Sequence, residues 1–202
     1  MTRVWDVPTS RGVARVHLDQ AEQPRCRLVL GHGAGGGVAA PDLVALAERL
    51  PTLGVAVWRV EQPWLVAGKR IATSPSVLDD AWTQVVATVP RDLPLVVGGR
   101  SAGARVACRT AGPLGAVAVV ALAFPLHPPG RPERSRADEL ASVPVPTLVV
   151  QGRSDPFGRP AELPPSPNVR VVAVAGDHAL RGNLDTVTAA VAEFLTVWST
   201  PR

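Results

Sequence analysis

A serine in a glycine-flanked pentapeptide has the clearest chemical potential in this chain. Ser101 lies in Gly99-Arg100-Ser101-Ala102-Gly103, after a β-branched run and before an alanine-rich segment. A sharp turn from strand to helix holds such a serine exposed and strained, and the glycines avoid collisions with neighbouring elements. A hydroxyl becomes nucleophilic when a nearby base takes its proton. The motif therefore predicts a nucleophile that needs a base and an acid from elsewhere in the chain.

An acid and a base follow the serine in the order that this chemistry requires. Asp155 lies in a turn after the apolar run 147–151, and His178 follows the apolar run 169–174. In a strand-turn-helix hydrolase the acid follows one late strand and the histidine follows the last. We therefore expect Asp155 to orient His178, and His178 to accept and return the proton of Ser101.

Other residues compete for these roles. Asp177 is the nearest rival acid, but it adjoins His178 and adjacent side chains usually point apart, while Asp42 and Asp138 occupy less suitable places. The rival bases are the three remaining histidines: His17, His32 and His127. Of these, His32 and His127, together with Arg100, are candidates to line the substrate pocket.

A glycine-rich segment, Gly31-His32-Gly33-Ala34-Gly35-Gly36-Gly37, follows the first buried apolar run. Acyl transfer needs backbone N–H donors for an oxyanion, one from the residue after the nucleophile and one from a loop after an earlier strand. Ala102 suits the first position. Ala34 is our candidate for the second, with Gly35 in reserve, because glycines let a substrate approach the backbone closely.

The same segment also matches a dinucleotide-binding fingerprint. Gly31, Gly33 and Gly36 have the required spacing, and Glu61 lies near the distance expected for a ribose-binding acid. Against this interpretation, Pro41 places the start of the helix beyond the last glycine, whereas the fingerprint should itself open the helix. A P-loop is excluded by the absence of the Lys-Ser/Thr pair, and no His or Cys pair has metal-ligand spacing. We expect neither metal nor cofactor.

The composition favours one globular domain over residues 1–202, with an edge hairpin in 1–20 and a core in 26–198. The 202 residues are 46% hydrophobic, and two isolated cysteines do not form a disulfide framework. No apolar block suggests a signal peptide or a membrane span, so we expect a cytoplasmic protein. The net charge of +4 is scattered rather than clustered, which argues against nucleic acid as a partner. The sequence leaves the oligomeric state open.

Short β-branched runs alternate with segments of helical period, a pattern that predicts an α/β fold with a mostly parallel sheet and helices on both faces. Residues 2–7 and 12–18 predict an antiparallel hairpin at a sheet edge. The segment 124–145 is too short for a cap domain. We expect further strands at 26–30, 55–60, 95–99, 117–123, 147–151 and 169–174, and helices beginning at Pro41, near Ser76 as N-cap, at Ser101 and at Leu184.

Five motifs in order carry a family resemblance: GHGAGG at 31–36, GGRSAG at 98–103, FPLHPPG at 124–130, QGRSDPFG at 151–158 and GDHAL at 176–180. Together they resemble the small α/β-hydrolase family that includes a testis-expressed protein and the hydrolase-like domain of a histone-acetyltransferase complex subunit, and that is related to dienelactone hydrolases. The resemblance implies a single-domain α/β-hydrolase fold with Ser101, Asp155 and His178 at the triad positions. It also implies that Arg100, Arg105 and His127 match family motif positions.

These observations favour a serine hydrolase that cleaves a small ester or thioester through an acyl-enzyme, with a small-molecule acyl compound as its partner. One alternative is a noncatalytic interaction domain that keeps the fold, because some relatives serve as scaffolds. Another is a nicotinamide-binding reductase, which rests on the glycine fingerprint alone.

Overall fold

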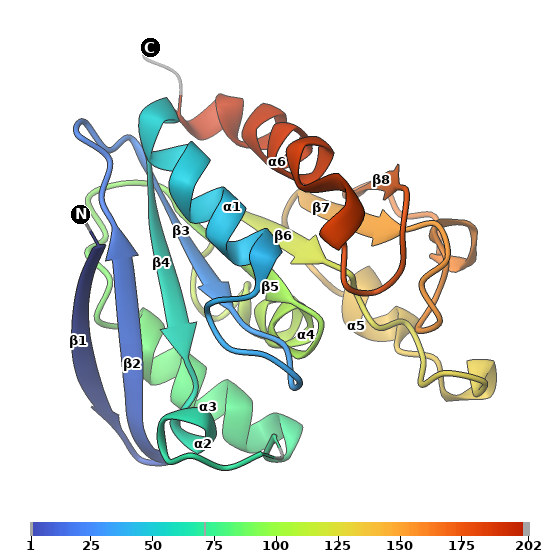
Figure 1. The fold of residues 1–202 in the computed structure, drawn as a ribbon, viewed down its shortest axis with the longest axis horizontal. Coiled ribbons are helices and arrows are strands. Elements are labelled where there is room, and N and C mark those ends of the chain that lie inside the picture. The colour runs from blue at the N-terminus through green and yellow to red at the C-terminus, as the bar shows by residue number, and fades with distance from the viewer. Residues whose placement is uncertain (1, 71, 200–202) are drawn as a thin grey trace.

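A computed structural model describes residues 2–70 and 72–199 and contains one eight-stranded sheet with the order β1-β2-β4-β3-β5-β6-β7-β8 (Figure 1). The ends of the expected domain, Met1 and 200–202, lie outside the described residues. β1 and β2 pair as an antiparallel hairpin, β2 pairs antiparallel with β4, and the remaining pairs are parallel. The strands are β1 Thr2–Thr9, β2 Gly12–Asp19, β3 Cys26–Gly31, β4 Val55–Glu61, β5 Leu95–Arg100, β6 Ala118–Leu122, β7 Thr147–Gly152 and β8 Val169–Val174.

The helices cover both faces of the sheet (Figure 1). They are α1 Pro41–Arg49, α2 Pro63–Val66, α3 Pro75–Val86, α4 Ala102–Thr110, α5 Ala137–Ala141 and α6 Leu184–Ser199. Helices α1 and α6 pack together on one face, while α3, α4 and α5 contribute to the core on the other. The expected α/β-hydrolase architecture is confirmed.

The core forms two layers because successive strand residues face opposite sides of the sheet. In β3, Leu28 and Leu30 pack in the layer under α1 and α6, whereas Val29 packs in the layer under α3 and α4. All three side chains are fully buried. A sheet covered on both faces needs strands that are apolar at nearly every position, and this explains the continuous apolar runs of the central strands.

Each layer contains one buried cysteine. Cys26 of β3 belongs to the layer under α1 and α6, and Cys108 of α4 belongs to the opposite layer. Burial raises the pKa of each thiol to about 12. Both thiols are free, so the two layers hold together without a covalent link between these residues.

The structure differs from the sequence-based expectations at the start of α3, in the hairpin turn and at α2. Ser76 is not the N-cap of α3: the helix begins at Pro75, and Ser74 occupies the N-cap position. Proline suits the first turn because its missing N–H would lack a partner there. The hairpin turn also contains fewer residues than expected, since Pro8 and Thr9 continue β1. The short helix α2 was not predicted.

The connection from β6 to β7 adds no cap. Within the described residues it contains a 3-10 turn at Pro132–Arg134 and the helix α5. Leu140 of α5 is buried in the same layer as α3 and α4. Among the described residues, this connection therefore places no helical domain over the carboxyl ends of the parallel strands. No helix in 2–70 or 72–199 has the length and apolar character to cross a membrane.

Candidate active site

Ser101 occupies the turn between β5 and α4 in a strained conformation, with φ of 52° and ψ of −111°. A non-glycine residue rarely adopts such a backbone, and strain of this kind concentrates at functional sites. The flanking glycines are required by a close backbone contact. A Cβ at Gly99 would lie 2.5 Å from the Gly31 carbonyl oxygen, and a Cβ at Gly103 would lie 2.3 Å from it. The end of β3 thus packs directly against the turn that presents Ser101.

Ser101, His178 and Asp155 form a continuous hydrogen-bonded chain. The His178 Nε2 atom lies 2.9 Å from Ser101 Oγ, and its Nδ1 atom lies 2.8 Å from Asp155 Oδ2. Asp155 follows β7 and His178 follows β8, so neighbouring parallel strands deliver both groups to the same edge of the sheet. The structure brings together the three residues that the sequence singled out.

Asp155 is held in place by hydrogen bonds of its own. Its side chain is buried, and Oδ2 accepts from Gln151 Nε2 at 2.9 Å while Oδ1 accepts from the Phe157 N–H at 2.8 Å. The Phe157 ring also packs against the His178 ring, with centroids 4.2 Å apart. These contacts limit the imidazole to an orientation that faces both Asp155 and Ser101.

Asp177, the rival acid, faces a different direction. Its Oδ1 accepts a hydrogen bond from the Ala179 N–H at 2.9 Å, in a contact exposed to solvent. The Asp177 backbone packs closely against the end of β7, where a Cβ at Gly152 would lie only 2.4 Å from the Asp177 carbonyl oxygen. The glycine at the end of β7 therefore lets the loop that carries His178 approach closely.

Arg100 supports the histidine loop and lines neither of the cavities described below. Its Nη2 donates to the His178 carbonyl oxygen at 2.8 Å. Its Nε lies 3.0 Å from Asp42 Oδ2 at the start of α1 and forms an ion pair with it. Asp42 is fully buried, and this burial raises the pKa of its carboxyl while Arg100 opposes the rise. Sequence spacing gave no signal of this pair.

His32 lies beneath the glycine-rich segment as a buried, neutral support. Its Nδ1 lies 2.8 Å from the Gly33 carbonyl oxygen, and the Gln62 N–H donates to its Nε2 at 3.1 Å. The ring therefore donates at Nδ1 and accepts at Nε2. Burial lowers the pKa of His32, which favours this neutral form. The residue fixes the loop and also contributes to the cavity beside it.

The other two histidines pair with glutamates away from Ser101. His127 Nε2 lies 3.0 Å from Glu162 Oε2, and the hydrogen bond to this carboxylate raises the pKa of His127. His17 Nε2 lies 3.3 Å from Glu61 Oε2 where β2 pairs with β4. His127 touches the site only indirectly, because its N–H donates to the carbonyl oxygen of Phe157.

Arg105, the remaining family-motif position, lies on α4 and forms an ion pair with Glu139 of α5 at 2.5 Å. This contact ties the two helices together one turn after Ser101, whose carbonyl oxygen accepts a hydrogen bond from the Arg105 backbone N–H at 3.2 Å. Among the residues in 2–70 and 72–199, no group of three or more His, Cys, Asp or Glu side chains is arranged to hold a metal ion.

The glycine-rich segment forms a loop between β3 and α1. A turn closes it through a hydrogen bond of 3.4 Å from the Gly36 N–H to the Gly33 carbonyl oxygen. Helix α1 begins only at Pro41, so these glycines do not open a helix as a dinucleotide fingerprint requires. A Cβ at Gly33 would lie 3.4 Å from Ser101 Cβ, which places the loop directly beside the serine.

A narrow apolar cavity adjoins the loop and the first turn of α4. On the site side it is bounded by Gly33, Ala34 and Ala102, and its far walls come from α2 and α3. Trp64, Leu78 and Trp82 form most of those walls, and each side chain is buried. These residues were missed in the sequence because they lie in segments with no chemical motif. Only the fold brings them beside Ser101.

The comparisons with known proteins agree with this architecture. A family model described as an alpha/beta hydrolase domain matches residues 24–190, and the chain belongs to that family. A search of the curated proteins found no match.

Solved structures with a similar fold include an α/β serine hydrolase without a lid from Xanthomonas campestris, with a TM-score of 0.82, 20% identity, and coverage of 100% of this chain and 96% of that one. Est1E from Butyrivibrio proteoclasticus has a TM-score of 0.78, 17% identity, and coverage of 96% and 98%. A dienelactone hydrolase from Anabaena variabilis has a TM-score of 0.77, 19% identity, and coverage of 98% of both chains.

Proposed function

We propose that this protein is a serine hydrolase that cleaves a small ester or thioester through an acyl-enzyme. The observation that carries the proposal is the hydrogen-bonded chain from Ser101 through His178 to the buried Asp155. The strained backbone of Ser101 and the serine hydrolase of similar fold from Xanthomonas campestris support it. A chain of nucleophile, base and orienting acid is the arrangement that activates a hydroxyl.

In the proposed reaction, Ser101 Oγ attacks the substrate carbonyl carbon while its proton passes to His178 Nε2. Asp155 stabilises the resulting imidazolium, and His178 then returns the proton to the departing alcohol or thiol. A water molecule, deprotonated by the same histidine, attacks the acyl-enzyme and releases the acid. The reaction begins and ends with the same protonation states.

The oxyanion would be held by backbone N–H groups of Ala102 and Ala34, with Gly35 in reserve. Ala102 is the first residue of α4, and the first N–H groups of a helix have no partner within it. Ala34 follows Gly33, whose backbone lies beside Ser101. The helix N-terminus also favours the negative charge that develops on the oxygen.

The alternative is a noncatalytic interaction domain, the role suggested by the finer resemblance to the histone-acetyltransferase complex subunit. The complete hydrogen-bonded chain at Ser101 favours catalysis, because a domain used only for interaction would need none of its three members. The reductase alternative loses its support because α1 begins only at Pro41, several residues after the glycines that should open it.

A fluorophosphonate probe tests the proposal directly, since it forms a covalent bond with an activated serine. We expect the wild-type protein to be labelled, Ser101→Ala to be unlabelled, and Asp155→Asn to react far more slowly. Ser142→Ala, at an exposed serine that follows α5, is the matched control and should label like the wild type. A wild-type protein that stays unlabelled, or equal labelling of Ser101→Ala, would contradict the proposal.

A further inference from the structure

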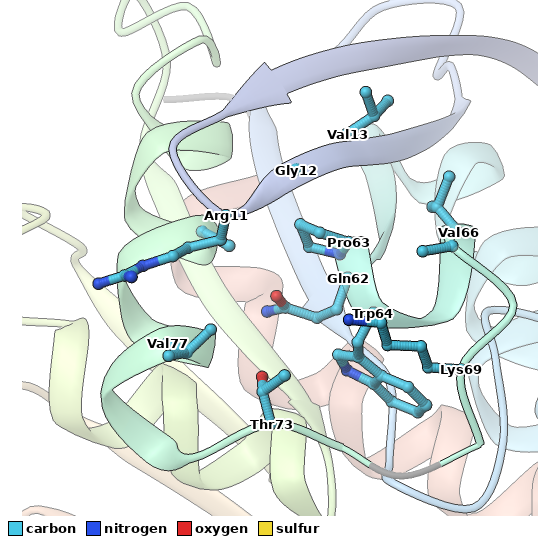
Figure 2. A pocket seen from close by; sticks show the side chains of 12 residues that line it. Arg11, Gly12, Val13, Gln62, Pro63, Trp64, Val66, Lys69, Thr73 and Val77 are labelled. Carbon is cyan, nitrogen blue, oxygen red and sulfur yellow. The ribbon is translucent and has the colours of Figure 1, made fainter.

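Two cavities lie next to each other between α2 and α3. The inner one is the apolar cavity beside Ala34 and Ala102. The outer one is bounded by the hairpin turn, α2 and the start of α3 (Figure 2). Gln62 and Trp64 belong to the walls of both cavities. In Figure 2 the Trp64 indole lies along one side of the outer cavity, with the Gln62 side chain beside it. Gln62 and Trp64 are therefore the boundary that the two spaces share.

The position of the leaving group relative to His178 determines which part of a substrate enters the inner cavity. The leaving oxygen or sulfur must come within hydrogen-bond reach of His178 Nε2 to receive its proton. The acyl substituent then points away from His178. The inner cavity adjoins the oxyanion loop on the side of α2 and α3, and neither His178 nor Phe157 belongs to its walls. It therefore suits the acyl group rather than the leaving group.

The inner cavity is very small. Its volume is only about 10 Å³. A methyl group fits such a space, whereas each further methylene brings the acyl chain closer to Trp64, Leu78 and Trp82. The volume of the outer cavity is about 320 Å³. The small space beside Ala34 and Ala102 therefore shares its Trp64 wall with a much larger one.

Rigid neighbours hold the separating wall in place. The Trp64 side chain is only 5% exposed, and its ring packs against the buried His32 ring with centroids 5.5 Å apart. Trp82 is also buried, and its six-membered ring lies against the Gly31 backbone, where a Cβ would be 3.3 Å from Cζ3. These contacts hold both indoles against the inner cavity, and the outer cavity lies on the far side of Trp64.

We propose that the inner cavity is an acyl pocket for acetyl-sized groups and that Trp64 sets this limit by closing the pocket off from the outer cavity. The proposal rests on the proposed function of Ser101 and names its substrate class: esters or thioesters of acetate, with the leaving group at the open edge of the sheet. The reaction is the acyl transfer already described, so no further reactant is required.

The test compares p-nitrophenyl acetate, butyrate and hexanoate by kcat/KM. A missing or extra methylene in an apolar pocket changes kcat/KM by roughly 10- to 200-fold, so we expect wild-type protein to favour acetate over butyrate by at least about 10-fold. Trp64→Ala should join the cavities and raise the butyrate-to-acetate ratio by about 10-fold or more. Trp64→Leu, which keeps an apolar side chain in the wall, should raise it less.

Two neighbouring residues of α3 supply matched controls. Leu78 belongs to the inner cavity and Val77 to the outer one. Leu78→Ala should therefore raise the butyrate-to-acetate ratio, while Val77→Ala should leave it unchanged. Thermal unfolding and fluorophosphonate labelling establish that each variant is folded with a reactive serine.

The outcomes separate the two proposals. Ser101-dependent hydrolysis with equal kcat/KM for all three esters would overturn the acyl-pocket proposal alone. An unchanged ratio in folded Trp64→Leu and Leu78→Ala would do the same. Absence of both hydrolysis and labelling would overturn the proposed function, and the acyl pocket with it.

Discussion

Arg100 joins three segments that meet behind the serine. Its guanidinium contacts the His178 carbonyl oxygen and the Asp42 carboxylate, so the end of β5 is tied to the histidine loop and to the start of α1. Asp42 has no exposed surface. A buried carboxylate that loses its cation keeps its desolvation penalty but loses the electrostatic attraction that offset it.

We therefore predict that Arg100→Gln lowers the free energy of unfolding by roughly 3–5 kcal/mol, the usual cost of breaking a buried ion pair. The double variant Arg100→Gln/Asp42→Asn should recover most of this loss, because two neutral amides leave no buried charge. Urea unfolding of the two variants and the wild type measures the difference. A double variant as unstable as Arg100→Gln would show that the ion pair is not the cause.

Individual residues differ in how far the sequence reveals them. Ser101, Asp155 and His178 can be found because each follows a recognisable apolar strand, and parallel strands bring their carboxyl ends to one edge. Arg100 was placed in the pocket by its motif position, but its partners lie far away in the chain. Trp64 and Leu78 carry no motif at all. Their place beside the serine depends on packing that no local pattern encodes.

The buried His32 ring holds the loop between β3 and α1 in its conformation. His32 accepts the Gln62 N–H at Nε2, which a protonated imidazole cannot do. Because burial lowers the pKa of His32, the folded protein resists a proton that the unfolded chain accepts near pH 6.5. Stability from His32 is therefore present above this pH and is lost as the pH falls through it.

We predict that lowering the pH from 7.5 to 5.5 costs the wild type more unfolding free energy than it costs His32→Gln, with an upper limit of about 1.4 kcal/mol per pH unit below the unfolded pKa. Glutamine keeps an acceptor for the Gln62 N–H and does not titrate. His127, with its raised pKa, acts in the opposite sense and cancels in the comparison. Equal losses in the two proteins would contradict the prediction.

Whole elements were predicted well where the apolar pattern was long. The six strands β3 to β8 agree with the structure to within about one residue at either end. Five of them lie inside the sheet, where a strand covered on both faces must be apolar throughout, and the edge strand β8 is found by its β-branched run. The short helix α2 was missed because four residues, Pro63–Val66, are too few to show a helical period. The start of α3 was misplaced because Ser74 and Ser76 are both suitable cap residues, and Pro75 decides between them.

At the scale of the molecule, the fold class followed from the alternation of strands and helices, and the motif order pointed to the α/β-hydrolase family. The position of the cavities did not follow. The inner cavity needs the glycine-rich loop, α2, α3 and the first turn of α4 at once, and these segments meet only in the assembled chain. The absence of a cap among the described residues was predictable, because the connection from β6 to β7 is short.

The reactivity of the two buried cysteines can report local unfolding of the layers that contain them. A thiol reagent reaches Cys26 only when the α1 and α6 layer opens, and Cys108 only when the α3 and α4 layer opens. The layers share every central strand, so they should open as one cooperative unit.

We predict that Cys26→Ser and Cys108→Ser, each with one remaining thiol, react at equal rates with a disulfide reagent under native conditions. Both rates should rise together with urea, since each then reports global opening. A much faster reaction at one cysteine would mean that its layer detaches first. The side of the sheet that is quicker to open would then be known without any introduced label.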